Sequence, residues 1–155
     1  MKRHAYEVRV DWTGNEGKGT ETYRSYRRDH EITSGSKAGI PGSSDPAFLG
    51  DPARYSPEEL LVASLSGCHM LWYLHLCAVS GVVVLGYCDT AAGEMAENVD
   101  GSGQFTRVVL RPVVRIAAGG DPGKASALHH EAHRYCFIAR SVNFPVELEP
   151  EVFVD

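Results

Sequence analysis

The stretch that decides the fold is a long apolar segment at residues 56–81, which reads SPEELLVASLSGCHMLWYLHLCAVSG. Its beginning is typical of a helix N-terminus: Ser56 can cap the helix, Pro57 suits the first helical position, and Glu59 completes a capping box. Gly81 is typical of the residue at which a helix ends. Apolar side chains fall on most faces of this helix, so the sequence predicts that it is buried on nearly all sides.

Patterns of strand and helix residues flank this segment. Strands are expected over residues 6–12, 20–30, 82–91, 105–117 and 146–154, with a further strand near Ile32, and a second helix over residues 124–134. Residues 34–55 are predicted to be a long irregular loop, either functional or a mobile surface connection. The order of strands, long helix, strands, helix and strand indicates one α+β domain over residues 1–155, with antiparallel sheet rather than alternating parallel βαβ units.

Composition indicates an ordinary globular protein, with 43% hydrophobic residues and a formal net charge of −5. Nucleic acid is not expected as a partner, because phosphate binding needs a concentrated positive patch and the chain has no basic run. The first residues include no apolar run of signal-peptide length. The apolar segment 70–79 is judged too short to span a bilayer. We therefore expect a cytoplasmic protein that does not bind membranes.

The chemistry of the chain depends on its cysteines, which are Cys68, Cys77, Cys88 and Cys136. No pair has the C-x-x-C spacing, so neither a structural zinc site nor any other metal site is expected. Cys77 and Cys88 are predicted to be inert core residues. The residues one turn before Cys68, Ser64 and Gly67, are small, and Ala63 and Gly67, four positions apart, either let another element approach closely or leave room beside the sulfur.

The second candidate cysteine, Cys136, follows the second predicted helix directly. If the next few residues form another helical turn, its thiol lies near a helix N-terminus, where the dipole lowers a thiol pKa. Packing in the core is the equally weighted alternative.

The histidines give weaker signals. His129 and His133 are four residues apart and could share a metal ion, but a solvated helix face is the favoured interpretation because nothing else supplies convergent ligands. His69 and His75 are predicted to be buried polar groups with hydrogen-bond partners.

Glu58 is a candidate functional residue in the first turn of the long helix. It precedes Cys68 by ten positions, which corresponds to about 15 Å along a helix. The two residues therefore cannot meet within one chain, although they could meet if two copies of the helix pack antiparallel. Compensation of the helix dipole is the simpler alternative for Glu58.

Several motifs of the chain resemble the OsmC/Ohr family, the osmotically inducible protein C-like and organic hydroperoxide resistance proteins. They occur in order over nearly the whole chain: WTG at 12–14, GKGT at 17–20, SPEELL at 56–61, SGCH at 66–69 and AHRYC at 132–136. The resemblance implies an OsmC-like fold, with antiparallel sheets around a long central helix. It also implies an intertwined homodimer with its active sites at the interface.

The same resemblance implies a cysteine-based organic hydroperoxide reductase, an antioxidant oxidoreductase of the stress response. Cys68 would be the peroxidatic residue, and Cys136 the resolving residue of a redox-active disulfide. Glu58 would pair with an active-site arginine. The implied partners are an organic hydroperoxide and a lipoyl-type dithiol reductant, without flavin, haem or another cofactor.

No clean match identifies the arginine. Arg28 is the favoured candidate because it would share a strand face with Arg24 and Tyr26, and Arg24 and Arg54 remain open. The segment Ala47-Phe48-Leu49 stands where related chains would have an arginine in the loop.

An alternative function is a non-enzymatic OsmC-like module that binds a small apolar ligand while both thiols stay inert. Phe137 follows Cys136 where the family usually has proline, and this departure supports the alternative. Acyl transfer by a cysteine nucleophile is disfavoured, because His69 points about 100° away from Cys68 on a helix.

Overall fold

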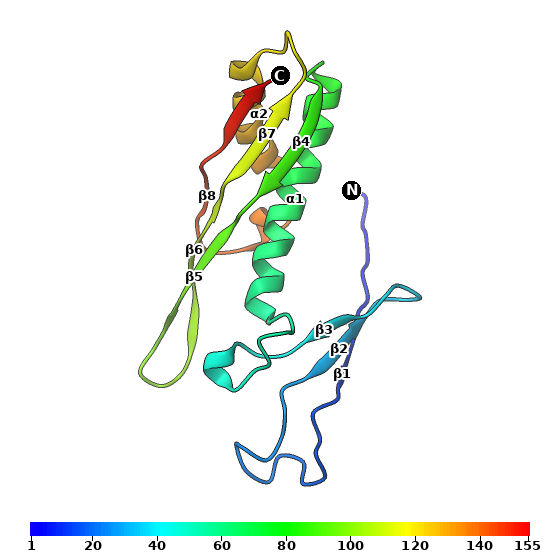
Figure 1. Ribbon diagram of the computed structural model, residues 1–155, viewed down its shortest axis with the longest axis vertical. Helices are drawn as coiled ribbons and strands as arrows, with labels where there is room; N and C mark the ends of the chain where they lie inside the picture. Colours follow the sequence, from blue (N-terminus) through cyan, green and yellow to red (C-terminus); the bar gives the residue numbers. More distant parts are fainter. The chain divides into compact units, whose positions relative to one another are not determined.

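The computed structural model describes residues 1–155 and divides them into two compact units, Met1–Leu60 and Leu61–Asp155. The first unit holds a three-stranded antiparallel sheet in the order β1-β2-β3, with one short 3-10 helix (Figure 1). Its elements are β1 (Arg9–Trp12), β2 (His30–Thr33), β3 (Ile40–Gly42) and η1 (Pro46–Phe48).

The prediction of a strand over residues 20–30 is wrong. Most of this segment forms turns, because the Ser25 hydroxyl donates to the carbonyls of Gly19 and Thr22 and so folds the chain back on itself. The strand expected near Ile32 is confirmed as β2. The segment predicted as an irregular loop, residues 34–55, contains β3 and η1.

The long helix α1 (Pro57–Val79) forms where the sequence predicts it. Its capping box is complete: the Ser56 amide donates to Glu59 Oε2 at 2.9 Å, and the Glu59 amide donates to Ser56 Oγ at 3.2 Å. Gly81 follows the helix with a φ of 77°, the left-handed conformation that ends helices.

One face of α1 is buried in the chain, through Leu65, His69, Tyr73 and Cys77, which are spaced four residues apart. By contrast, Leu71 is 66% exposed and Val79 is 67% exposed. The prediction that the helix is buried on nearly all sides is therefore wrong for a single chain.

Length and composition alone would allow α1 to cross a membrane, because it is a helix of 23 residues with an apolar 18-residue window. This window extends beyond the apolar segment 70–79 considered in the sequence. Core helices of soluble proteins share both properties.

The second unit holds two three-stranded sheets, in the orders β4-β7-β9 and β5-β6-β8. Their elements are β4 (Val84–Asp89), β5 (Ala92–Glu97), β6 (Gly103–Leu110), β7 (Pro112–Ile116), β8 (Val146–Leu148) and β9 (Glu151–Val154). β8 pairs parallel with β6, and β9 pairs parallel with β7. The expectation of purely antiparallel sheet is therefore wrong for the last two strands.

The strand predicted over residues 105–117 is in fact two strands that belong to different sheets. They separate at Arg111, whose amide donates to Asp89 Oδ1 at 2.7 Å instead of to a neighbouring strand. Asp89 Oδ2 also accepts a hydrogen bond from Ser66 of α1, which ties the helix to this bend. β5, which the sequence did not predict, pairs antiparallel with β6.

The second helix, α2 (Pro122–Tyr135), is close to its predicted range. Asp121 caps it by accepting from the amides of Gly123 and Lys124. Both α1 and α2 lie against one face of the β4-β7-β9 sheet (Figure 1). The buried residues between them are Tyr73, Cys77, Val82, Val114, Ile116, Ala125 and Ala132.

Candidate functional site: two thiols beside a buried histidine pair

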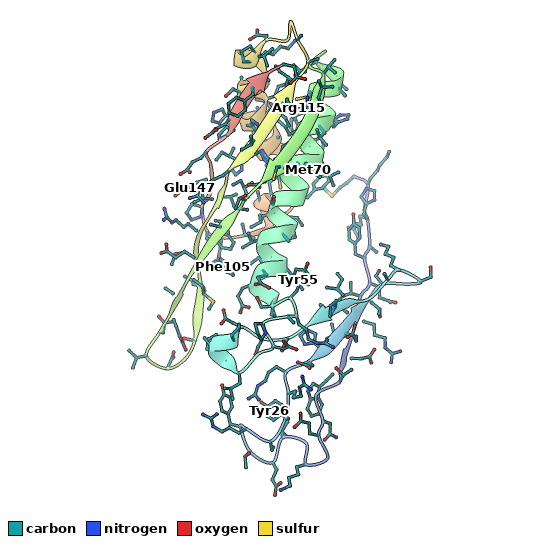
Figure 2. All side chains as sticks on the ribbon, in the orientation of Figure 1. Tyr26, Tyr55, Met70, Phe105, Arg115 and Glu147 are labelled. Carbon is teal, nitrogen blue, oxygen red and sulfur yellow. The ribbon has the colours of Figure 1, made fainter.

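Cys68 and Cys136 come from different helices and lie next to each other. Both thiols are free, and they lie close enough that Cys68 contributes to raising the pKa of Cys136. Cys68 is half-buried on α1, two residues before Met70, which Figure 2 labels. Gly67 beside it faces open space, since a Cβ there would meet no atom within 4 Å. The surface of the helix beside Cys68 is therefore open at Gly67.

Cys136 is the C-cap of α2 and is only 1% exposed. Burial, together with a smaller contribution from the neighbouring Cys68, raises the pKa of its thiol to about 11. The short helical turn expected after it is confirmed as η2 (Ala139–Ser141), and the Ala139 amide donates to the Cys136 sulfur at 3.4 Å. The expected lowering of the Cys136 pKa is nevertheless wrong, because burial outweighs this interaction.

The other two cysteines differ from each other. Cys77 is buried in the core, where burial raises the pKa of its thiol, and the prediction for this residue is confirmed. Cys88 is exposed on β4, so the prediction that it is a core residue is wrong.

A pair of buried imidazoles lies in the core between α1 and α2. His69 and His129 are 1% and 0% exposed, and a hydrogen bond of 3.0 Å joins His69 Nε2 to His129 Nδ1. Tyr73 stacks on the His129 ring at 3.8 Å between ring centroids. Burial lowers the pKa of His69 to about 4 and that of His129 to about 3, so both rings are neutral near pH 7.

The expectation that the α2 histidines form a solvated face is thus wrong for His129, although His130 is exposed. His75, predicted to be buried, is also exposed. His133 is half-buried, and its Nδ1 has no hydrogen-bond partner. No group of three or more His, Cys, Asp or Glu side chains could hold a metal ion.

Aromatic side chains surround the thiol pair on one side. Trp72, one turn after Cys68, stacks on Tyr135 at 5.1 Å and meets the edge of Phe137 at 5.5 Å. These two rings flank Cys136 in the sequence. A shallow hollow of about 250 Å³ is lined by Leu71, Trp72 and His75. The arrangement provides an apolar surface next to the sulfur atoms.

Glu58 belongs to the first unit, in the first turn of α1. Its Oε2 is buried and accepts no hydrogen bond within the chain. A buried carboxylate oxygen without a partner is costly, so this atom is suited to a cationic partner.

The three candidate arginines have different surroundings. Arg28 donates to the carbonyls of Tyr26 and Tyr23 at 2.6 Å each and lies over both rings, without any carboxylate partner (Tyr26 is labelled in Figure 2). Arg54 is paired with carboxylates, 3.0 Å from Glu31 and 3.7 Å from Asp29. The strand face that suggested Arg28 does not exist, because these residues precede β2.

Sequence reasoning missed the buried histidine pair. A signal was present on α2, where Ala125, His129, Ala132 and Cys136 recur at spacings of four, three and four residues. A stripe of small side chains at helical spacing indicates a face against another helix, so a histidine within it should be buried.

Comparison with known proteins identifies the family. A scan of family models matches residues 50–151 to the OsmC-like proteins. This chain belongs to the OsmC-like protein family. The resemblance inferred from the sequence motifs and the α+β OsmC-like fold are both confirmed. A search of curated proteins gives no match.

Solved structures of OsmC-like proteins agree with this assignment. An OsmC-like protein of unknown function from Vibrio cholerae is 33% identical, with a TM-score of 0.85 over 96% of this chain and 99% of the other. An organic hydroperoxide resistance protein from Legionella pneumophila is 16% identical, with a TM-score of 0.69 over 98% of each chain. One from Elizabethkingia anophelis, with bound thiocyanate, is 16% identical, with a TM-score of 0.68 over 99% and 100%. The last two support the fold alone.

Proposed function

We propose that this OsmC-like protein is a thiol-dependent peroxidase that reduces organic hydroperoxides to alcohols. Cys68 is the peroxidatic residue and Cys136 the resolving residue. The observation that carries the proposal is a pair of free thiols from two different helices, which lie close enough for Cys68 to raise the pKa of Cys136. The family supports it, since it includes organic hydroperoxide resistance proteins.

The first step takes place at Cys68, whose thiolate attacks the outer oxygen of the hydroperoxide. An S–O bond forms, the O–O bond breaks, and the alkoxide leaves with a proton as the alcohol. Cys68 is then a sulfenic acid. Half-burial of Cys68 and the open space at Gly67 are consistent with entry of a small organic substrate.

The second step forms the disulfide. The Cys136 thiol gives up its proton and its sulfur attacks the sulfenic sulfur of Cys68, so that an S–S bond forms and hydroxide leaves as water. An external dithiol of the lipoyl type then reduces this disulfide and becomes a disulfide itself. The raised pKa of Cys136 favours this order of events, because a protonated, buried thiol is a poor nucleophile toward peroxide.

Glu58 and an arginine complete the proposed site across a homodimer. The unpartnered Glu58 Oε2 suits a guanidinium that would also stabilise the Cys68 thiolate. Arg28 remains the favoured candidate, since no carboxylate neutralises it, whereas Asp29 and Glu31 already pair with Arg54. Arg24 also has no carboxylate partner, so it is the second candidate.

The test is consumption of cumene hydroperoxide with dihydrolipoamide as the reductant. Wild type should turn over, and Cys68→Ser and Cys136→Ser should each lose turnover, while Cys88→Ser, a matched change at an exposed thiol, should retain it. Mass spectrometry should find one disulfide, between Cys68 and Cys136. A wild type that leaves the hydroperoxide intact under these conditions refutes the proposal.

The second candidate function is binding of a small apolar ligand without catalysis. The aromatic surface of Trp72, Tyr135 and Phe137 and the adjoining hollow favour it. This function predicts that Cys68→Ser binds an apolar fluorescent probe as wild type does, and that Trp72→Ala weakens that binding. Peroxide turnover by wild type would make catalysis the primary function.

A further inference from the structure

The contact between α1 and α2 is apolar apart from a few polar groups that join the two helices. His69 Nε2 and His129 Nδ1 share a hydrogen bond of 3.0 Å, and the Tyr73 hydroxyl donates to the Ala125 carbonyl at 3.0 Å. The two imidazoles are nearly parallel, with an interplanar angle of 7°. All of these groups belong to the same compact unit.

Stability alone does not explain the histidine pair. His69 Nδ1 and His129 Nε2, the outer nitrogens of the two rings, are buried without any partner. A buried nitrogen without a partner destabilises the folded state, and two apolar side chains of similar size would avoid this cost. What the pair provides is a directional contact, because a hydrogen bond is lost when its atoms move beyond about 3.5 Å.

Formation of a disulfide also requires the two helices to be precisely aligned. Cys68 directly precedes His69, and Cys136 lies two turns after His129 on the same face of α2. A disulfide needs its two Cβ atoms about 3.5–4.5 Å apart. A slide of α2 by a single residue moves it about 1.5 Å along α1 and so displaces both the sulfur pair and the histidine nitrogens from their aligned positions.

We infer that His69 and His129 are a positioning pair, whose hydrogen bond fixes α2 along α1 and so holds Cys136 within bonding range of Cys68. The inference deepens the proposed function, since it concerns the disulfide formed in its second step. It assigns no contact with substrate to either histidine.

The experiment uses amide side chains that replace one imidazole nitrogen at a time. The amide of asparagine reaches about as far as Nδ1 of histidine, and that of glutamine about as far as Nε2. His129 bonds through Nδ1 and His69 through Nε2. We therefore expect His129→Asn and His69→Gln to keep the hydrogen bond, and His129→Gln and His69→Asn to lose it.

The readout is the equilibrium between the full-length protein and oxidised dithiothreitol, followed by mass spectrometry of the Cys68–Cys136 disulfide. Two protein thiols are oxidised while one dithiothreitol disulfide is reduced to the dithiol. The variants that lose the hydrogen bond should show an equilibrium constant at least about tenfold lower, which corresponds to ~1.4 kcal/mol. His129→Asn, His69→Gln and the exposed control His130→Asn should stay within about threefold of wild type.

The decisive result is that asparagine preserves the disulfide equilibrium at position 129 but not at position 69, whereas glutamine preserves it at position 69 but not at position 129. Equal effects of both amides at each position would mean that only packing matters, and would overturn the inference, as would a wild type that forms no Cys68–Cys136 disulfide. The assay contains no hydroperoxide. If the peroxidase assay fails but the asparagine and glutamine variants behave as expected, the positioning role stands. If the peroxidase assay succeeds but the variants do not behave as expected, only the positioning role is rejected.

Discussion

At the scale of single residues, Cys88 and Cys136 show that the same side chain has very different properties when it is exposed and when it is buried. Cys88 is exposed on a strand, whereas Cys136 is buried, with a pKa raised to about 11. The sequence predicts the reverse for Cys88, because a cysteine in a strand is most often a core residue. It also suggests the wrong direction for Cys136, since a sequence shows the neighbouring helical turn but not how deeply the sulfur is buried.

The first prediction concerns alkylation of these thiols. At neutral pH, iodoacetamide should modify Cys136 at least about 100-fold more slowly than Cys88, because a pKa about two units above the ordinary value lowers the thiolate fraction by that factor. Peptide mass spectrometry over a time course measures both rates. In denaturant the two rates should converge, and equal rates in the native protein would contradict the burial of Cys136.

The second prediction concerns acid stability. His69 and His129 have pKa values of about 4 and about 3 in the folded chain, below the ordinary value, so the unfolded chain binds more protons as the pH falls. The free energy of unfolding should therefore be largest above about pH 6.5 and should decrease toward about pH 4, by up to ~1.4 kcal/mol per pH unit for each histidine.

Urea unfolding at several pH values measures this slope. The charged or titratable neighbours that act on the pair are His133 and Asp89 at His69, and His130 at His129. The double variant His69→Gln/His129→Asn should flatten the dependence over this range. A variant whose slope equals that of wild type would assign the acid sensitivity to other groups.

At the scale of elements, local signals decide how well the sequence predicts the structure. The capping residues Ser56 and Glu59 and the terminal Gly81 locate α1 almost to the residue, because these interactions lie within a few positions of one another. β5 and the break at Arg111 depend on pairing with distant strands and on a hydrogen bond to Asp89, 22 residues away. Such contacts leave no local pattern.

The third prediction tests the helix cap. Ser56→Ala removes the hydroxyl that accepts from the Glu59 amide, and should lower the free energy of unfolding by about 1 kcal/mol. Ser64→Ala is the matched control, since this exposed hydroxyl donates only to the carbonyl of Leu61 within the helix. Ser64→Ala should change the free energy of unfolding by no more than about 0.5 kcal/mol. A Ser56→Ala variant as stable as the control would show that the cap contributes nothing.

At the scale of the whole molecule, the apolar surface that a single chain leaves uncovered is the main feature. α1 exposes Leu71 and Val79, and the first unit exposes Tyr6, Val8 and Val10. Large exposed apolar surfaces indicate interaction sites. The sequence predicts an apolar helix that needs a cover, and in the single chain one side of that helix is uncovered.

The fourth prediction tests the proposed homodimer. Leu71→Glu places a charge on the exposed apolar face of α1. It should raise the dissociation constant of the dimer at least about tenfold. Sedimentation equilibrium measures the change. Ser102→Glu, which adds the same charge in the exposed turn between β5 and β6, should leave the dimer unchanged. A wild type that sediments as a monomer would reject the homodimer itself.

The parallel pairing of β8 with β6 and of β9 with β7 has a consequence for how the protein is made. Both edge strands follow every other element of the second unit in the chain, so neither sheet can be completed before these two strands have left the ribosome. At about 5–20 residues per second, the helices emerge seconds before the strands that close their sheets. Cys68 and Cys136 thus leave the ribosome before the sheets around them are complete.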